Sequence, residues 1–285
     1  MNKEQFLTVM KIFVQEGGKI VLRYIRDSSP SLKPDQSIIT EADKAISVLA
    51  HELLKEFLTR GDHILIDEED EQRGRYLNQA KLAPIPYLWA IDPIDGTRNY
   101  ANRMPNFGIS IGLLKDLKPW LGMVYFPLLN ELFYCDGQEA YFVQNAFGDL
   151  EHRERIIPVD QVISKQSIFL LTDSFFQSFD WDNKDCHVMI PACAVVDLCW
   201  PAIGRGCGAI LKSYLWDFAG SWPICHAAGL FLRSLSTGRV LDRLQEDLFM
   251  QDPKPWRLKD YYILSSERNY PILKAKISQT RGQKS

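Results

Sequence analysis

The sequence predicts a mixed α/β protein, and three observations support this prediction. Two amphipathic helical patterns occupy about the first 60 residues. Short apolar runs separated by turns then extend to residue 143, as in an antiparallel meander. From about residue 155, strand and helix patterns alternate. With 285 residues, the chain is long enough for two domains, and we expect its halves, 1–155 and 156–285, to pack into one compact unit.

The composition argues against several classes of protein. Lys and Arg total 33 and Asp and Glu total 36, so the net charge of −3 lacks the basic excess typical of nucleic-acid binding. No apolar run approaches the roughly 18 residues of a membrane span, and the start of the chain does not resemble a signal peptide. The six cysteines form no C-x-x-C pair and are expected to be buried thiols. We therefore expect a cytoplasmic protein with neither a membrane nor a nucleic-acid partner.

The N-terminal half begins with two predicted helices. Apolar residues recur at helical spacing within the first 26 residues, and Asp27–Pro30 ends that pattern. A polar loop is expected to run to about Ser37. Apolar residues between Ala42 and Leu58 form a second stripe, and Thr40 is placed to cap the second helix.

Several strands are expected next, and the pattern then changes. The apolar run His63–Ile66 predicts a strand, and the buried strand Tyr87–Ile91 is expected to end at Asp92. The meander is expected over residues 107–114, 120–126, 131–135 and 140–143. The C-terminal half is expected to contain a strand at 168–171, a helix at 193–203, a strand ending with Leu215–Asp217 and a helix over Phe218–Leu232. The last 15 residues are polar and are expected to be frayed.

Two glycine-containing segments are interpreted as ordinary structure. Gly108–Gly112 matches the G-x-S-x-G nucleophile elbow, which requires a strand, a sharp turn and a helix. Apolar residues alternate through this segment and Pro119 would interrupt a helix, so a strand is predicted instead. Gly204–Gly208 lacks the spacing of a nucleotide-binding loop and is predicted to be a turn.

Acidic residues gather at the predicted strand ends, where α/β proteins place their sites. They are Glu68 and Glu69, Asp92 and Asp95, and Asp217, together with Asp43 in the first turn of the second helix. Carboxylates without His or Cys favour hard cations such as Mg²⁺. Because like charges repel, gathering these residues makes chemical sense mainly around a metal ion.

The segment Asp92–Thr97 is the most informative part of the sequence. A proline stiffens the turn, and Asp92 and Asp95 are spaced so that both can point at one site. Gly96 lets the backbone approach a ligand closely, and the amides of Gly96 and Thr97 could receive a phosphate. The Thr97 hydroxyl could orient a water molecule. Metal, phosphate and water together predict metal-assisted phosphate hydrolysis.

These segments resemble the signatures of the inositol monophosphatase family. Trp89–Tyr100 resembles the first signature and Leu215–Gly220 the second. Thr40–Asp43 resembles the T-x-x-D element, and Ile66–Glu69 resembles the G-E-E element with Asp67 in place of glycine. All four elements occur in the family's order and spacing.

The resemblance implies a layered α-β-α-β-α sandwich, similar to that of inositol monophosphatase and fructose bisphosphatase. It further implies a Mg²⁺-dependent, lithium-sensitive phosphomonoesterase that forms a homodimer. Its substrate would be a small phosphorylated metabolite. An activated water would attack phosphorus in line, and no phosphoenzyme would form.

The resemblance also implies the ligands of two to three Mg²⁺ ions. Glu69, Asp92 and the Ile94 carbonyl would bind the first ion, and Asp92, Asp95 and Asp217 the second. Glu69 and Asp43 would hold a third ion through water. Catalytic roles fall to Glu69, Thr97 and Asp43, and the phosphate would lie against Gly96, Thr97, Asp95 and Asp217.

Alternative interpretations stay open for some residues. Asp43 could simply complete a capping box, and Asp217 could be a helix N-cap. The register could also shift by one residue and make Glu68 the ligand instead of Glu69.

The substrate is not determined by these motifs. Inositol phosphatases hold inositol hydroxyls with a glutamate seven residues before the second-signature aspartate, and here that residue is Ile210, with Lys212 nearby. The alternatives are a nucleotide phosphatase acting on 3′-phosphoadenosine 5′-phosphate and a non-catalytic regulatory binding protein on the same fold.

Overall fold

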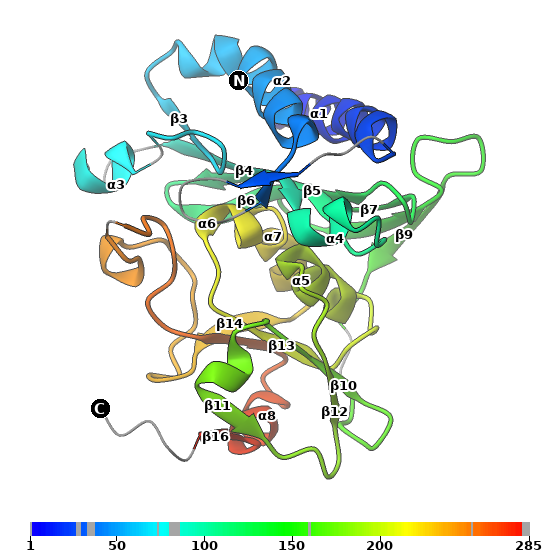
Figure 1. The fold of residues 1–285 in the computed structure, drawn as a ribbon, viewed down its shortest axis with the longest axis vertical. Helices are drawn as coiled ribbons and strands as arrows, with labels where there is room; N and C mark the ends of the chain where they lie inside the picture. The colour runs from blue at the N-terminus through cyan, green and yellow to red at the C-terminus, as the bar shows by residue number, and fades with distance from the viewer. Residues whose placement is uncertain are drawn as a thin grey trace.

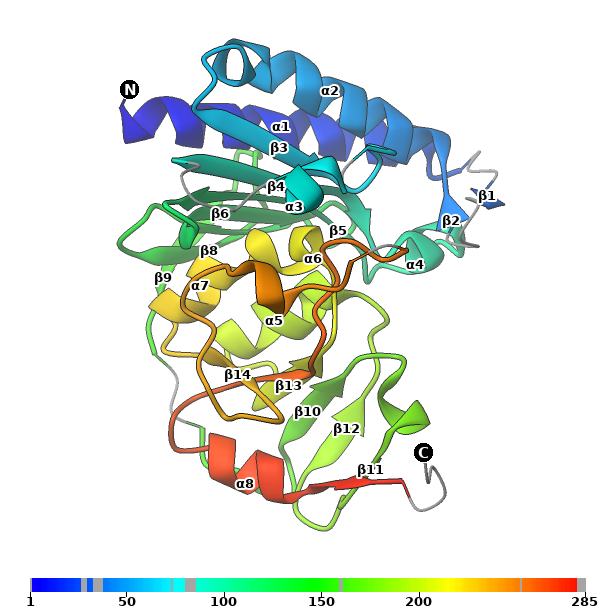
Figure 2. The ribbon, with the colours of Figure 1, turned by 90° about the vertical axis from the view of Figure 1, so that its left-hand side faces the viewer.

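The protein is a layered α-β-α-β-α sandwich, as predicted (Figure 1 and Figure 2). The computed structural model describes residues 2–26, 30–32, 38–72, 74–79, 86–158, 161–251 and 253–280. Two sheets form the inner β layers, and helices lie outside and between them.

The first layer consists of the two predicted N-terminal helices, α1 (Lys3–Tyr24) and α2 (Glu41–Leu58). Their apolar faces cover one side of the larger sheet, as Figure 2 shows. A capping box at Thr40 begins α2. Two short paired strands, β1 (Ser31–Leu32) and β2 (Ile38–Ile39), lie where only a polar loop was predicted. Much of that predicted loop lies outside the described residues.

The larger sheet has seven strands in the order β3-β4-β5-β6-β7-β8-β9. Its strands are β3 (His63–Asp67), β4 (Tyr87–Asp95), β5 (Gly108–Lys115), β6 (Lys118–Phe126), β7 (Glu131–Cys135), β8 (Ala140–Gln144) and β9 (His152–Ile156). Strands β3 and β4 are parallel and each later pair is antiparallel, so the predicted meander is confirmed. Strand β9 escaped prediction because four of its five residues are polar and exposed.

Strand β4 does not end at Asp92 as predicted. It continues to Asp95, and its pairing with β5 shifts register between these two residues. The short helix α3 (Arg75–Gln79) lies between β3 and β4 in the chain, and α4 (Thr97–Ala101) follows β4. Gly108–Gly112 lies in β5, so the strand interpretation of the G-x-S-x-G segment is confirmed.

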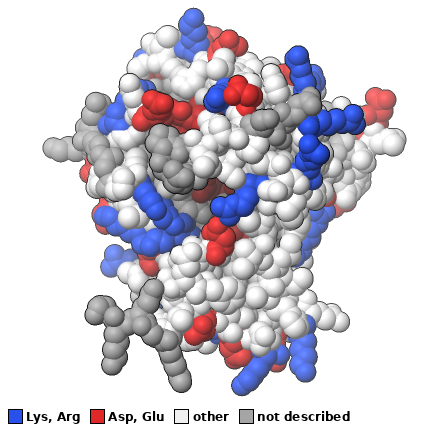
Figure 3. Space-filling model, viewed as in Figure 1, with Lys and Arg blue, Asp and Glu red and all other residues white. Residues whose placement is uncertain are grey.

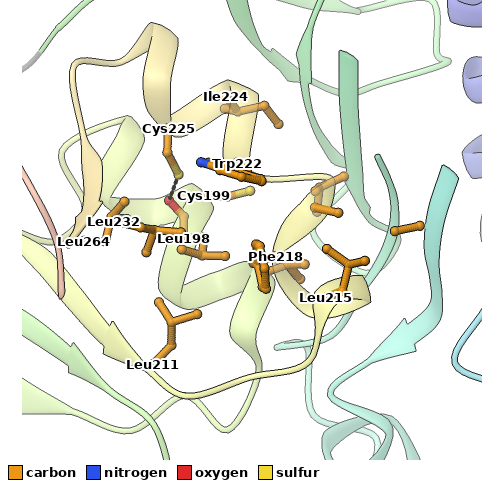
Figure 4. Packing of buried hydrophobic residues seen from close by; sticks show 14 of the residues in the cluster. Leu198, Cys199, Leu211, Leu215, Phe218, Trp222, Ile224, Cys225, Leu232 and Leu264 are labelled. Atoms are coloured by element: carbon orange, nitrogen blue, oxygen red, sulfur yellow. Dashed lines mark hydrogen bonds between the residues drawn. The ribbon is translucent and has the colours of Figure 1, made fainter. Parts of the chain in front are cut away.

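The middle layer contains three helices between the two sheets: α5 (Ala194–Ala202), α6 (Leu215–Ala219) and α7 (Trp222–Ala227). Figure 4 shows their buried side chains packed together, including Leu198, Phe218 and Trp222. The predicted strand at Leu215–Asp217 is wrong, because the Asp217 carboxylate accepts a 2.9 Å hydrogen bond from the Tyr214 amide and begins a helix there.

The single helix predicted over Phe218–Leu232 is also wrong. A proline at the start of α7 begins a second helix, and Gly229, with φ of +73°, lies beyond its end. The chain then enters strand β14 (Phe231–Ser234).

The smaller sheet has five strands in the order β12-β10-β13-β15-β14. Besides β14 they are β10 (Ile168–Leu171), β12 (His187–Met189), β13 (Gly208–Leu211) and β15 (Tyr262–Ser265). Two 3₁₀ helices, η1 (Phe175–Gln177) and η2 (Glu246–Leu248), lie in the connections.

The C-terminal segment forms the last layer. Helix α8 (Tyr270–Ala275) packs beyond the smaller sheet, and β16 (Ile277–Gln279) pairs with β11 (Phe179–Trp181). The expected fraying is therefore wrong for residues 271–279, because Leu273 is buried in an apolar cluster beneath the smaller sheet. Residues 281–285 lie outside the described residues. The division of the chain at residues 155/156 stays a prediction.

Two glycines let the middle layer approach the larger sheet closely. A Cβ atom on Gly112 of β5 would lie 2.5 Å from the backbone of Ala219, and one on Gly122 of β6 would overlap the carbonyl oxygen of Gly220. The end of α6 therefore rests directly on the backbone of the sheet. This contact fixes the distance between Asp217 and the carboxyl end of β4.

Replacing Gly122 tests this contact. Gly122→Ala should lower the free energy of unfolding by about 3 kcal/mol, because the obstructing atom belongs to the backbone and cannot rotate away. Chemical denaturation of both proteins measures the change. Gly148→Ala is the control, since its Cβ would meet only one atom, at 3.3 Å. Equal stabilities of the two variants would contradict the close packing.

Candidate active site

Four acidic side chains from three elements lie close together between the larger sheet and the middle layer. Glu68 directly follows β3, Asp92 and Asp95 belong to β4, and Asp217 belongs to α6. Asp92 is 2% exposed and Asp95 is 8% exposed. Burial of several acids in one place requires compensation, because each ionised carboxylate loses hydration and repels the others.

The electrostatics of the cluster reflect this crowding. Burial, and then the charges of Glu68, Asp95 and Asp217, raise the pKa of Asp92 well above its usual range. Burial, followed by the charges of Asp95 and Glu68, likewise raises the pKa of Asp217. Burial raises the pKa of Asp95 to about 6, against the opposing effect of backbone hydrogen bonds from Val195 and Ala194.

The structure brings Glu68, rather than Glu69, to the cluster. After burial, the charge of Glu68 contributes most to the raised pKa of Asp92, and a close side-chain contact with Glu68 adds to it. The Glu69 amide donates to Oδ1 of Asp67 at 2.9 Å, and its carboxylate contributes to the raised pKa of Lys44, whose largest cause is Glu41. The structure thus favours the alternative register that the sequence left open.

Asp67 replaces the expected glycine and anchors this turn. Its Oδ2 accepts a 2.5 Å hydrogen bond from the Ser47 hydroxyl and lies 3.3 Å from Nε2 of His51, both on α2. Together with the Glu69 amide, these contacts fix the turn that presents Glu68.

Backbone amides orient two of the acids. Oδ2 of Asp95 accepts a 2.5 Å hydrogen bond from the Val195 amide at the start of α5, and Oδ2 of Asp217 accepts from Tyr214 at 2.9 Å. Among the described residues, no donor bonds to the buried Oδ1 of Asp92. Within that same part of the chain, no three His, Cys, Asp or Glu side chains are arranged to hold a metal ion. The donor type fits a hard cation, because all four groups are carboxylates and one buried oxygen has no partner.

The turn after β4 has the predicted form. Gly96 has φ of +84° and begins α4, and a Cβ there would lie 2.9 Å from the carbonyl oxygen of Asn106. The Thr97 hydroxyl donates to the Ile94 carbonyl at 2.9 Å. The Thr97 hydroxyl and the Ile94 carbonyl, which were both predicted to face the metal site, are therefore hydrogen-bonded to each other.

Asp43 completes the capping box of α2, which is the structural role that the sequence left open for it. It is fully buried, and its Oδ2 accepts a 2.7 Å hydrogen bond from the Thr40 amide in the capping box of α2. Its charge also contributes, after burial, to the raised pKa of Tyr100 on α4, so Asp43 lies beside the turn that carries Thr97. A role in holding a third metal ion stays a prediction.

A cavity of about 240 Å³ opens beside the cluster. Asp95 and Asp217 line it together with residues that sequence reasoning did not assign to the site: Asp173, Asp197, Tyr214 and Arg257. Lys212 lines it too, whereas Ile210 is fully buried in the apolar cluster beneath the smaller sheet. Asp197 is 3% exposed, and burial raises its pKa well above the usual range. Its sequence context, a short apolar helix, gave no sign of a site residue.

The remaining sequence expectations concern cysteines and membrane helices. All six cysteines are buried and free, as predicted. No helix in the described ranges is long and apolar enough to cross a membrane.

Fold and site together define a layered α/β protein with a buried carboxylate cluster, the arrangement of a phosphate-ester hydrolase. A model of the inositol monophosphatase family matches residues 2–281. The chain belongs to the inositol monophosphatase family, and the protein is a phosphoric monoester hydrolase.

Individual relatives agree with this assignment. An inositol-1-monophosphatase of Synechocystis is 40% identical over 223 residues, covering 72% of this chain and 71% of the relative. A fructose-1,6-bisphosphatase/inositol-1-monophosphatase of Aquifex aeolicus is 26% identical over 80% of this chain and 85% of the relative. A crystal structure of an IMPase/NADP phosphatase complexed with Mg²⁺ and phosphate has a TM-score of 0.72 and 17% identity, covering 99% of this chain and 98% of that one.

The raised pKa of Asp95 predicts a pH dependence of stability. The folded state holds the Asp95 proton more tightly than the unfolded state does, so this stabilisation is complete below about pH 4 and is lost as the pH rises through about 6. Without divalent cations, the part of the free energy of unfolding due to Asp95 should fall by about 2 kcal/mol between pH 4.5 and 7. Urea denaturation with a chelator measures it, and Asp95→Asn should show a correspondingly smaller fall. An unchanged fall in the variant would contradict the burial of this acid.

Proposed function

We propose that the protein is a Mg²⁺-dependent phosphomonoesterase that releases inorganic phosphate from a small phosphorylated metabolite. The observation that carries the proposal is the cluster of Glu68, Asp92, Asp95 and Asp217, in which Asp92 and Asp95 are buried. Burial and the neighbouring acidic charges raise the pKa values of Asp92, Asp95 and Asp217, and Oδ1 of Asp92 lacks a hydrogen-bond donor among the described residues. A hard divalent cation would offset the repulsion among the acids and would give Oδ1 of Asp92 a partner.

Five groups are proposed to hold Mg²⁺. They are the carboxylates of Glu68, Asp92, Asp95 and Asp217 and the carbonyl of Ile94. Glu68 replaces Glu69 in this set because the charge of Glu68 contributes to the raised pKa values of Asp92, Asp95 and Asp217. When bound, Mg²⁺ would polarise the phosphate and increase the acidity of a nearby water. The Mg²⁺ in the IMPase/NADP phosphatase structure supports this choice of ion.

The turn after β4 is proposed to receive the phosphate and the attacking water. The amides of Gly96 and Thr97 lie at the start of α4, where backbone N–H groups lack helical partners. Because the Thr97 hydroxyl donates its hydrogen to Ile94, its oxygen can accept a hydrogen bond from a water molecule. This bond would orient the water's lone pair toward phosphorus.

The reaction is a single displacement. The water oxygen forms a bond to phosphorus as the ester P–O bond breaks on the opposite side. The departing oxygen ends with a proton, so the products are an alcohol and inorganic phosphate. Homodimer formation, lithium sensitivity and a cytoplasmic location are further proposals that rest on membership in the family.

A matched pair of variants tests the proposed ligands. Glu68→Gln should lower kcat/KM for phosphate release by at least 100-fold and weaken Mg²⁺ binding, because it removes one charge from the cluster. Glu69→Gln changes an adjacent residue outside the cluster and should alter kcat/KM less than threefold. Phosphate release from inositol 1-phosphate, fructose 1,6-bisphosphate and 3′-phosphoadenosine 5′-phosphate measures activity, and calorimetry measures Mg²⁺ binding.

Two outcomes would contradict the proposal. A larger loss in Glu69→Gln than in Glu68→Gln would overturn the choice of ligand. Phosphate release that is unaffected by a chelator would overturn the metal dependence.

A further inference from the structure

Two basic residues line the cavity next to the acid cluster. Lys212 lies just after β13, and Arg257 lies on the segment whose backbone forms a bridge with Tyr214. Both side chains are half-buried. Within the described ranges, no carboxylate lies within the 4.0 Å of an ion pair with either residue. They therefore bring positive charge to the cavity that the protein does not neutralise by direct pairing.

Each of these two cations lies over an aromatic ring. Nζ of Lys212 lies 5.2 Å from the centre of the Tyr261 ring, and the Arg257 guanidinium lies 5.9 Å from the centre of the Tyr214 ring. Such contacts position a cation and leave its N–H groups available to an anion. Tyr214 is in turn stacked on Trp216, with ring centres 4.7 Å apart.

Three of the four acids that line the cavity have other contacts, whereas Asp197 is buried and its Oδ1 has no hydrogen-bond partner among the described residues. Asp173, at the edge of the cavity, lies 3.7 Å from Arg98 of α4. Asp95 and Asp217 accept hydrogen bonds from backbone amides and belong to the proposed metal cluster. The charge of Arg257 also acts on Asp217 and lowers its pKa, against the larger effect of burial. Figure 3 shows acidic and basic side chains interspersed around the middle of this face rather than separated into patches of one sign.

The wall of the cavity also lacks a polar acceptor at the position that the sequence comparison singled out. Ile210 points into the apolar cluster with Phe169 and Ile263, and the Lys212 side chain reaches the cavity. Ile210 therefore supplies no carboxylate to this wall, and Lys212, two residues further along the chain, supplies a cation.

We propose that Lys212 and Arg257 bind a second phosphate group of the substrate, so that the enzyme selects bisphosphorylated small metabolites over monophosphates. The inference rests on the proposed phosphatase function and specifies its substrate class. The scissile phosphate lies at the acid cluster and its metal ions, and the second phosphate lies at the two cations. Guanidinium groups suit phosphate because they can donate two parallel hydrogen bonds.

The test compares substrates that differ only in the second phosphate. The pairs are fructose 1,6-bisphosphate with fructose 1-phosphate, and 3′-phosphoadenosine 5′-phosphate with adenosine 3′-phosphate. With Mg²⁺, kcat/KM should be at least 10-fold higher for the bisphosphate in at least one pair. The pair that shows the preference distinguishes a sugar from a nucleotide substrate.

Variants assign the preference to the two cations. Lys212→Met and Arg257→Met should each lower kcat/KM for the preferred bisphosphate by 10- to 100-fold, mainly through KM, and change the monophosphate less than threefold. Lys254→Met, an exposed lysine near Arg257 in the chain, is the control and should retain the preference. Thermal unfolding shows whether each variant is folded.

Three results separate this inference from the proposed function. Equal kcat/KM values within both pairs, or a preference retained in both cation variants, would overturn the inference and leave the phosphatase intact. Absence of phosphate release from all four compounds would overturn the proposed function. Calorimetric titration of the same compounds then decides the inference: weaker bisphosphate binding in the variants supports it, and unchanged or absent binding overturns it.

Discussion

The repulsion among four crowded carboxylates, of which Asp92 and Asp95 are buried, is the constraint on which the structure of this site depends. Glu68, Asp92, Asp95 and Asp217 come from three separate elements, and the fold holds them together although burial and mutual charge raise the pKa values of three of them. Such a cluster persists only where the surrounding packing opposes the repulsion. In this protein, the opposing structure consists of side-chain and backbone contacts that leave the acids little freedom to separate.

Three contacts provide that opposition. Asp67 fixes the turn carrying Glu68 to α2 through Ser47 and His51. The Val195 amide holds Asp95 against the start of α5. The glycines of β5 and β6 allow the end of α6 to rest on the sheet, which places Asp217 near β4. Together these contacts hold acids of the larger sheet and of the middle layer in place.

Sequence reasoning predicted the elements with strong patterns and missed those governed by tertiary contacts. Short apolar runs separated by turns fill residues 108–144, so the meander was predictable, whereas β9 has a polar sequence and exists through its pairing with β8. Leu215–Asp217 was wrongly predicted as a strand. The hydrogen bond from the Tyr214 amide to Asp217 begins a helix there, and the apolar sequence gives no sign of that bond. The motif spacing could not distinguish Glu68 from Glu69, since a turn decides which side chain meets Asp92. Lys212 and Arg257 are 45 residues apart in the chain, and only the fold shows that they share a cavity.

The central claim is that the four carboxylates form a divalent-cation site, and a crystal soaked in Mn²⁺ tests it most directly. Anomalous diffraction locates Mn²⁺ independently of any assumption about the ligands. A strong peak within about 2.5 Å of carboxylate oxygens of Asp92 and at least one of Glu68, Asp95 and Asp217 is the predicted result. An empty cluster at saturating Mn²⁺ would contradict a divalent-cation site at these four carboxylates. A peak bound only to Glu69 and other residues outside the cluster would contradict it too.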